Sequence, residues 1–102
     1  MKIYIKDYTV TPGMRYESEG KYSGEEYRET ILIPKFTECM NKKDKLIVNL
    51  DGLYGYPSSF LEEAFGGLSR KFGKKLVKSI ISIECYDDES QIDRIKRYIE
   101  GK

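Results

Sequence analysis

The stretch LIVNLDGLYGYPSSFLEEAFGGL (residues 46–68) decides the fold. It opens with LIVNL at 46–50, a continuous apolar run with a single Asn, which is typical of a central strand buried on both faces. An Asp-Gly pair ends the strand, and a turn rich in Gly and Pro leads to two serines. The remainder has helical spacing and predicts an amphipathic helix from about Ser59 to Phe72.

The predicted helix carries signals at its start and in its interior. Ser59 and Glu62 have the spacing of a capping box, so Ser59 is predicted to cap the helix. Gly66 and Gly67 each cost about 1 kcal/mol relative to Ala inside a helix. We therefore expect this helix to approach a neighbouring backbone of the sheet closely, although a functional surface that needs bare backbone is the alternative.

The segments before this stretch add strands and one more helix. Residues 2–6 alternate apolar and polar side chains, which predicts a half-buried strand, and residues 8–11 allow a second short strand. Ser23, with Glu26 three residues later, forms a capping box that begins a helix. Pro34 lies inside this helical run and predicts a kink or a break near the preceding residue.

The segments after residues 46–68 complete an alternation of strands and helices. Residues 79–85 are rich in β-branched side chains and predict a strand. Ile92, Ile95 and Ile99 form the apolar stripe of a last helix, which Ser90 or a nearby Asp caps. The order predicts an α/β (α+β) fold in one domain over residues 1–102, with a mixed four-stranded sheet and three to four helices packed against it.

The composition excludes several classes of function. Histidine is absent, which excludes Ser-His-Asp and Cys-His catalysis and histidine-based metal sites. Cys39 and Cys85 are interpreted as reduced, buried thiols and form no zinc motif. No acid–base constellation is visible, so the chain is not expected to be an enzyme, and no catalytic residue, metal or cofactor is predicted.

The charge balance and hydropathy indicate the class of partner. The net charge of +1 provides no global field for nucleic acid. No segment reaches membrane-spanning length and no signal segment opens the chain, so we expect neither a membrane nor a secreted location but the cytoplasm. The basic run at 70–78 fits a solvated helix end better than a phosphate-binding surface.

Ser58 is the residue that local structure explains least. It is not needed as a cap if Ser59 is one, and it follows Pro57 at the carboxyl end of the central strand, where α/β sheets present their sites. A phosphate on Ser58 would meet exposed amides at a helix start. A phosphoacceptor and a plain turn serine both fit the sequence.

Other candidates for a binding surface come from the loops and the first helix. Arg15, Glu25 and Arg28 are predicted to converge near Ser58, where an Arg pair would suit an anion; a structural Arg–Glu network is the alternative. Loop tyrosines are common at protein interfaces but also pack structurally. The loop tyrosines are Tyr16, Tyr22, Tyr54 and Tyr56.

Three blocks of this sequence resemble a known family. They are PGMRY at 12–16, SGEEYRE at 23–29 followed by Pro34, and DGLYGYPSSFLEEAFGGL at 51–68. Together they resemble the STAS-like domain of unknown function, DUF4325, which is related to the STAS domains of anti-sigma factor antagonists. The resemblance covers nearly the whole chain and implies a STAS-like fold.

In the antagonists, a serine at a helix start is phosphorylated by an anti-sigma factor with a histidine-kinase-like ATPase fold, and phosphorylation breaks the complex. By position, Asp51 matches the strand-end Asp of that motif, and Ser58 and Ser59 match its serine pair. Pro57 stands where the motif has Asp, and Phe60 stands where it has Gly. The resemblance implies a regulatory module that binds such a protein partner; a small-molecule or nucleotide module using a pocket at the same helix start is the alternative.

Overall fold

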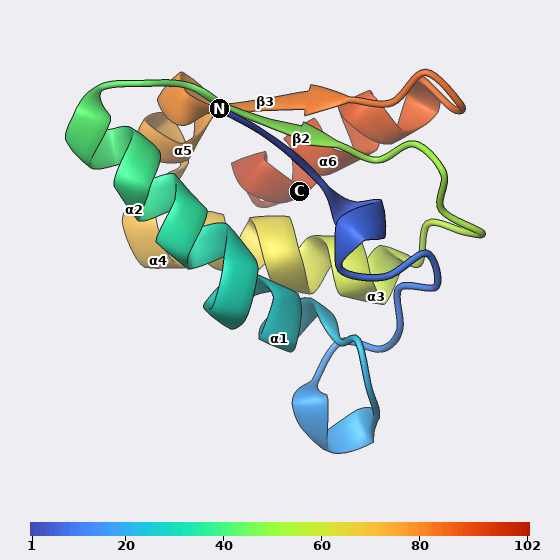
Figure 1. The fold of residues 1–102 in the computed structure, drawn as a ribbon. Helices are drawn as coiled ribbons and strands as arrows, with labels where there is room; N and C mark the ends of the chain where they lie inside the picture. Colours follow the sequence, from blue (N-terminus) through green and yellow to red (C-terminus); the bar gives the residue numbers. More distant parts are fainter.

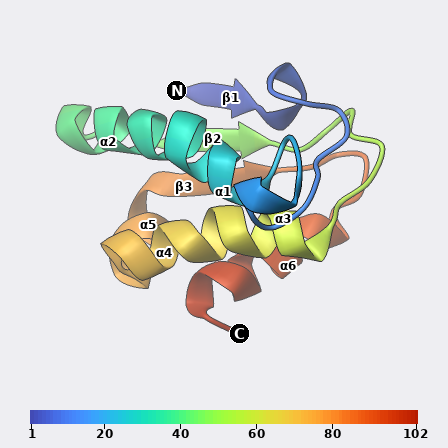
Figure 2. The same ribbon diagram turned by 90° about the horizontal axis from the view of Figure 1, so that it is seen from below.

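The computed structural model describes residues 1–102 and contains one small parallel sheet. Strands β1 (Lys2–Tyr4), β2 (Leu46–Asn49) and β3 (Ile81–Glu84) lie in the order β1-β2-β3, and both pairings are parallel. Figures 1 and 2 show the helices packed together against one side of this sheet. The position of β2 confirms the central strand predicted from residues 46–68.

Helices account for most of the rest of the chain. Two long helices each contain a π-helical turn. The first long helix consists of α1 (Gly24–Tyr27), the π turn η3 (Arg28–Leu32) and α2 (Ile33–Lys42). The second consists of α3 (Ser58–Leu61), the π turn η4 (Glu62–Gly66) and α4 (Gly67–Phe72). The regular helices α5 (Lys74–Ile80) and α6 (Ser90–Glu100) follow, and the 3₁₀ turns are η1 (Ile5–Asp7) and η2 (Glu17–Glu19).

The first long helix passes through Pro34 without breaking. Pro34 has no N–H to donate to the carbonyl four residues earlier, and the chain widens into the π turn just before it. In that turn the Ile33 N–H donates to the Arg28 carbonyl five residues back. The irregularity predicted near Ile33 is therefore present as a π turn, and the helix continues to Lys42.

The fourth strand predicted at residues 8–11 is not present, and the sheet is not mixed. After β1 the chain turns through η1, and the N–H groups of Tyr8 and Thr9 both donate to the Ile5 carbonyl at 2.9 Å. The Thr11 N–H is satisfied by the Thr9 hydroxyl at 3.1 Å. Three of the four backbone donors of residues 8–11 are thus used locally, and the Val10 carbonyl accepts from the Tyr54 N–H of the loop after β2, so the segment forms no strand ladder.

The covered face of the sheet supplies one wall of the hydrophobic core. The strand register places Ile3, Val48 and Ile83 in one row, which packs toward the helices. The opposite wall includes Ile95 and Ile99 of α6, which are 0% and 4% exposed and confirm the predicted apolar stripe. At about 25 cal/mol per Å² of apolar surface, this burial is the main favourable contribution to folding.

The other face of the sheet is open and polar, which corrects the prediction that β2 is buried on both sides. Ile47 points to this face and is only half-buried. Lys2 Nζ lies 2.7 Å from Glu84 Oε1, so an ion pair spans the central strand. Asn49 Nδ2 also donates to Glu84, at 2.9 Å. These contacts provide polar groups that suit a solvated sheet face.

The two cysteines lie within the hydrophobic core. Cys39 and Cys85 are both buried free thiols, as predicted. No helix combines the length and the apolar run that crossing a membrane requires.

The glycines in the second long helix serve a purpose different from the predicted one. A Cβ on Gly67 would overlap the guanidinium of Arg28, and one on Gly66 would overlap the Glu62 carboxylate. Both glycines therefore make room for charged side chains rather than for the sheet. The close backbone approach occurs at Gly24, whose Cβ would overlap the Phe60 carbonyl oxygen where the two long helices cross.

The starts of the helices agree only in part with the caps predicted from the sequence. The Ser23 hydroxyl accepts from the Glu26 N–H at 3.0 Å, which confirms the first cap. The second long helix begins one residue earlier than predicted, at Ser58, with Pro57 in the cap position and no side-chain cap, so Ser59 does not cap it. At α6, Asp88 accepts from the Ser90 N–H at 3.1 Å and so takes the capping role.

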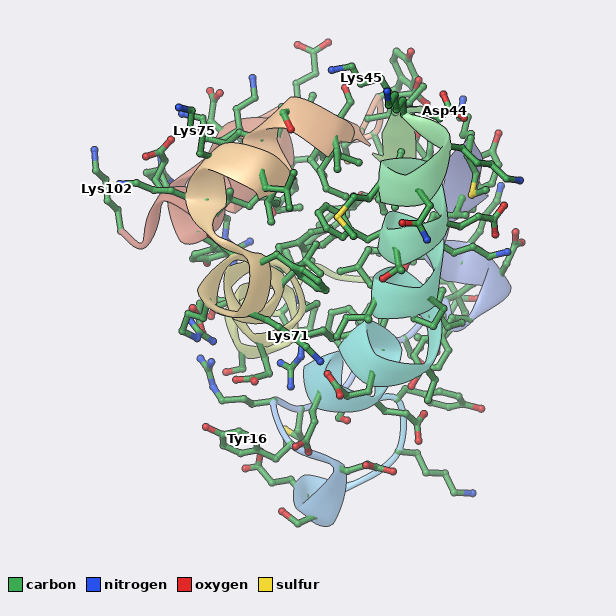
Figure 3. All side chains as sticks on the ribbon, turned by 90° about the vertical axis from the view of Figure 1, so that its left-hand side faces the viewer. Tyr16, Asp44, Lys45, Lys71, Lys75 and Lys102 are labelled. Atoms are coloured by element: carbon green, nitrogen blue, oxygen red, sulfur yellow. The ribbon has the colours of Figure 1, made fainter.

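Helix α5 was not predicted and forms directly after α4. Gly73 has φ +92°, a conformation that favours glycine, and it separates the two helices. The basic run at 70–78 thus spans a corner between two helices. Figure 3 shows Lys75 and Lys102 projecting outward on this side of the molecule.

Replacing Gly24 with Ala tests the helix crossing. The substitution should lower the free energy of unfolding by about 1–3 kcal/mol, because the new methyl group forces the two helices apart. This loss is expected even though Ala favours helices over Gly by about 1 kcal/mol. Urea denaturation measures it, with Gly55→Ala, where nothing lies within 4 Å of the added Cβ, as the matched control. Equal stability of the two variants would contradict the close approach.

Candidate functional site

The carboxyl ends of β2 and β3 are joined by a set of hydrogen bonds centred on Asp51. Asp51 Oδ1 accepts from the backbone N–H groups of Tyr86 and Asp87 at 2.7 and 2.8 Å. In return, the Gly52 N–H donates to Asp87 Oδ2 at 2.9 Å. We call these contacts the Asp51–Asp87 clasp. It holds the loop that follows β2 against the loop that follows β3.

The clasp depends on an ionised carboxylate. Desolvation alone would raise the pKa of Asp51, but the hydrogen bonds that it accepts from Asp87, Asn49 and Tyr86 outweigh desolvation and leave its pKa below the ordinary value of 3.8. The strand-end Asp is thus placed to organise loops. It also fixes its own turn, because its N–H donates to Asn49 Oδ1 at 2.8 Å.

The loops joined by the clasp expose two tyrosines at the same end of the sheet. Tyr54 is 85% exposed and Tyr86 is 73% exposed, the highest values among the large apolar side chains. The Tyr54 N–H donates to the Val10 carbonyl at 2.8 Å, so its backbone is held although its ring is free. On the right of Figure 1, the segments after β1, β2 and β3 lie at this end.

Tyr56 was predicted to be a loop tyrosine of the same kind as Tyr54, but its environment is different. It is half-buried, and its hydroxyl lies 3.6 Å from the Cys85 sulfur. Its carbonyl accepts from Arg94 Nη1 at 3.0 Å, which ties the loop to α6. Burial, followed by the contact with Cys85, raises the pKa of the Tyr56 hydroxyl. Tyr56 thus anchors the loop that Tyr54 exposes.

Ser58 and Ser59 lie at the start of the second long helix, directly after this anchored loop. Ser58 is exposed and Ser59 is half-buried, and neither hydroxyl makes a hydrogen bond within the protein. The free hydroxyl of Ser58 adjoins the unpaired N–H groups of the first helical turn. Ser58 was expected in the turn before the helix but is its first residue, and because Pro57 occupies the cap position, the Ser58 hydroxyl is not used as a cap.

Arg15 and Arg28 converge on the middle of the second long helix rather than on Ser58. Arg28 Nη1 donates to Glu63 Oε2 at 2.6 Å and to the Glu63 carbonyl at 2.8 Å. Arg15 Nη1 pairs with Glu62 and lies 3.2 Å from Glu63 Oε1. Arg70 Nη1 adds a bond to Glu62 Oε2 at 2.6 Å. These five residues form the Arg–Glu cluster, which corresponds to the structural network considered from the sequence.

The cluster is partly buried and strongly paired. The side chain of Glu63 is 10% exposed and that of Arg28 is 14% exposed, so the attraction between them offsets the cost of desolvating both charges. The hydrogen bond from Arg70, with support from Arg15, lowers the pKa of Glu62. Glu25 is not a member: its Oε1 accepts from the Glu17 N–H at 2.9 Å and fixes the loop before the first helix.

The surface cavities lie away from the predicted pocket at the helix start. Of the three cavities in the molecule, none is lined by any residue between 51 and 59. One of about 290 Å³ lies beside the Arg–Glu cluster and includes Lys71, whose side chain in Figure 3 extends between α4 and the first helix. The pocket predicted at the start of the second long helix is therefore not present as a cavity at residues 51–59.

Two members of the clasp were missed by sequence reasoning. Tyr86 and Asp87 follow β3 directly, and in a parallel sheet the residues after adjacent strands meet at one edge. The aromatic-acidic pair after the predicted strand at 79–85 was the available signal. This pair did not by itself predict a contact, because only the register of β2 against β3 brings Tyr86 and Asp87 to Asp51.

Removing the Glu63 carboxylate should be costly. Glu63→Ala leaves Arg28 without its principal partner, and we expect the free energy of unfolding to fall by about 3 kcal/mol. Glu29→Ala, which removes the half-exposed partner of Arg28 Nε, should change it by less than about 1 kcal/mol. Guanidinium denaturation compares the two. A Glu63→Ala loss no larger than that of Glu29→Ala would show that the cluster does not stabilise the fold.

Loss of the Asp51–Asp87 clasp should change hydrogen exchange locally and remove a dependence of that exchange on pH. In Asp51→Ala, the amides of Tyr86 and Asp87 should exchange with solvent at least about tenfold faster, while core amides of β2 keep their protection. Because the pKa of Asp51 is lowered in the folded state, its contribution to stability is full above the ordinary Asp range and is lost as pH falls through the lowered value.

The protection of these two wild-type amides, relative to the intrinsic exchange rate at each pH, should consequently fall as the solution is acidified below the ordinary Asp pKa of 3.8, and the variant should lack this dependence. Hydrogen exchange followed by NMR measures both effects. Asp88→Ala, which removes the α6 cap, is the control and should alter the Ser90 amide instead. Unchanged Tyr86 and Asp87 exchange in Asp51→Ala would contradict the clasp.

The fold and these contacts can be set beside known proteins. Comparisons with curated proteins and with solved structures gave no match. A family model described as a STAS-like domain of unknown function, DUF4325, matches residues 23–91. The match contains the two long helices, the Arg28–Glu63 contact, the Asp51–Asp87 clasp and the serine pair. With more than half of its length matched, the chain belongs to the STAS-like family DUF4325.

Proposed function

We propose that this chain is a regulatory module that binds a protein partner through the loops at the carboxyl end of its sheet. We define the partner surface as the exposed parts of residues 51–58 and 85–88. The observation that carries the proposal is the pair of tyrosines, Tyr54 and Tyr86, that project into solvent from loops held by the clasp. Large aromatic side chains on a rigid support supply contact area at low entropic cost.

The chemistry of the surface favours binding over catalysis. Its carboxylates are Asp51, Asp87 and Asp88. The first two accept from backbone amides, and Asp88 accepts from Ser90 and Gln91 at the start of α6, so all three are engaged within the protein. No cavity encloses a substrate there. We therefore assign the surface a binding role. Because the net charge of +1 provides no field for nucleic acid, we propose that its partner is a protein in the cytoplasm rather than a nucleic acid or a membrane.

A phosphate on Ser58 would act as the switch for this surface. Ser58 is exposed, its hydroxyl is free, and it begins a helix whose first N–H groups favour negative charge. A dianion beside Tyr54 and the clasp carboxylates changes the electrostatics of the surface without a change of fold. The STAS resemblance makes a histidine-kinase-like ATPase or anti-sigma factor the partner class we propose.

Co-purification from native cells tests the partner surface. Tagged wild-type chain should retain an ATPase of the histidine-kinase-like class, and the Tyr54→Ala/Tyr86→Ala double variant should retain at least about tenfold less of it. Tyr16→Ala, which removes an exposed tyrosine from a different loop, should behave as wild type. If the double variant retains the same partner as well as wild type does, the partner surface is elsewhere.

Intact mass before and after phosphatase tests the switch separately. Wild-type chain from the same cells should carry a phosphate-sized adduct that phosphatase removes and that Ser58→Ala lacks, while Ser59→Ala keeps it. An adduct that is lost only in Ser59→Ala would move the switch to Ser59. A chain that binds its partner but is never modified would leave the binding role standing and remove phosphorylation from it.

A further inference from the structure

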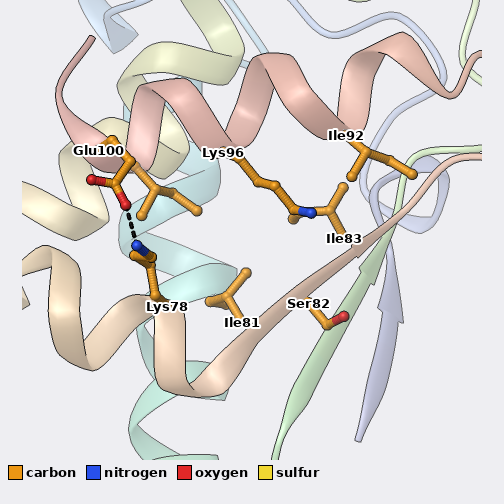
Figure 4. Close-up of a pocket in the computed structure, with 8 residues that line it drawn as sticks. Lys78, Ile81, Ser82, Ile83, Ile92, Lys96 and Glu100 are labelled. Carbon is orange, nitrogen blue, oxygen red and sulfur yellow. Dashed lines mark ion pairs between the residues drawn. The ribbon is translucent and has the colours of Figure 1, made fainter.

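A groove lies between the free edge of β3, the end of α5 and the outer side of α6 (Figure 4). It encloses about 300 Å³, the lower end of the range for small-molecule sites. Its apolar lining is formed by four isoleucines, which are Ile81, Ile83, Ile92 and Ile99. It does not overlap the partner surface, because its lining begins at Lys78 and includes no loop residue of that surface.

The charged residues of the groove are not balanced. Lys78 is paired with Glu100, which closes one end of the groove, and Lys74 Nζ lies 3.7 Å from the same carboxylate. Lys96 has no ion-pair partner and is exposed. Figure 4 shows its side chain extending along the groove toward Ile83 on β3. The groove therefore contains one uncompensated positive charge above an apolar floor.

The backbone of β3 supplies hydrogen-bonding groups at the same place. The Glu84 carbonyl accepts from the Leu50 N–H at 2.8 Å, so the backbone of Glu84 points inward to β2. Because successive residues of a strand point their N–H and C=O groups to opposite edges, the backbone of Ile83 points outward from the sheet. β3 is an edge strand, and no other strand covers that side.

We propose that this groove binds a small monocarboxylate with an apolar tail, such as a medium-chain fatty acid. The tail lies on the four isoleucines, and the carboxylate is held by the Lys96 ammonium and the outward backbone of β3. A single charge is the best complement, because Lys78 is already neutralised by Glu100. The apolar floor contains no aromatic ring for stacking a base, which favours an aliphatic tail over a nucleotide.

Octanoate and its uncharged analogue octan-1-ol are the probes for this groove. In ¹⁵N NMR titrations, octanoate should shift the amides of β3 and the facing turns of α6 saturably, with a Kd on the order of 1 mM. Octan-1-ol should bind at least about tenfold more weakly, because it lacks the charge that pairs with Lys96. In Lys96→Gln, the affinity for octanoate should fall to that of wild type for octan-1-ol.

The control is Lys75→Gln, which removes another exposed positive charge, from α5 outside the groove, and should leave octanoate binding unchanged. Equal binding of octanoate and octan-1-ol to wild type would overturn the proposal. So would an equal loss in both lysine variants, or shifts scattered over the whole surface as for a detergent. Because the groove and the partner surface share no residue, each can fail without the other failing.

Discussion

The contact on which the rest of this structure depends is the hydrogen-bonded ion pair between Arg28 and Glu63. It lies where the two long helices cross, and each residue belongs to a π-helical turn. One guanidinium nitrogen reaches both the carboxylate and the main-chain carbonyl of Glu63. A charge this deeply placed is tolerated only when it is paired, so the two helices have one favourable relative position. Gly67 and Gly24 serve this contact in different ways, because a Cβ at Gly67 would displace the Arg28 guanidinium, whereas one at Gly24 would overlap the Phe60 carbonyl oxygen at the crossing itself.

The helix crossing also determines what the loops can do. With the second long helix held in place, its first residue, Ser58, follows the loop at the carboxyl end of the sheet, and its hydroxyl makes no hydrogen bond within the protein. The Asp51–Asp87 clasp fixes the neighbouring loops from the sheet side. A small domain thereby presents exposed tyrosines and a free hydroxyl on rigid supports. Such a surface loses little conformational entropy when it is covered by a partner.

Sequence reasoning succeeded where the signal was local and failed where it depended on distant residues. The central strand, the Ser23 cap, the helix through Phe72 and the apolar stripe of α6 were all predicted, because each is written in periodicity or in a short spacing. The strand predicted at 8–11 was wrong, since the hydroxyl of Thr9 and the turn η1 satisfy three of its four backbone donors locally. Helix α5 was missed because Gly73 separates two helices that share one basic composition.

The sequence by itself determined the alternation of strands and helices, the reduced cysteines, the absence of histidine chemistry and the family resemblance that the family match confirms. Tertiary structure alone decided that Arg15 and Arg28 meet Glu63 instead of an anion at Ser58, and that Asp51 fastens the loop after β3. It also decided that the glycine pair accommodates charged side chains rather than the sheet. The physical reason is that local pattern reports which face of an element is apolar, whereas the partner of a charge is set by the crossing of helices and the register of strands far apart in the chain.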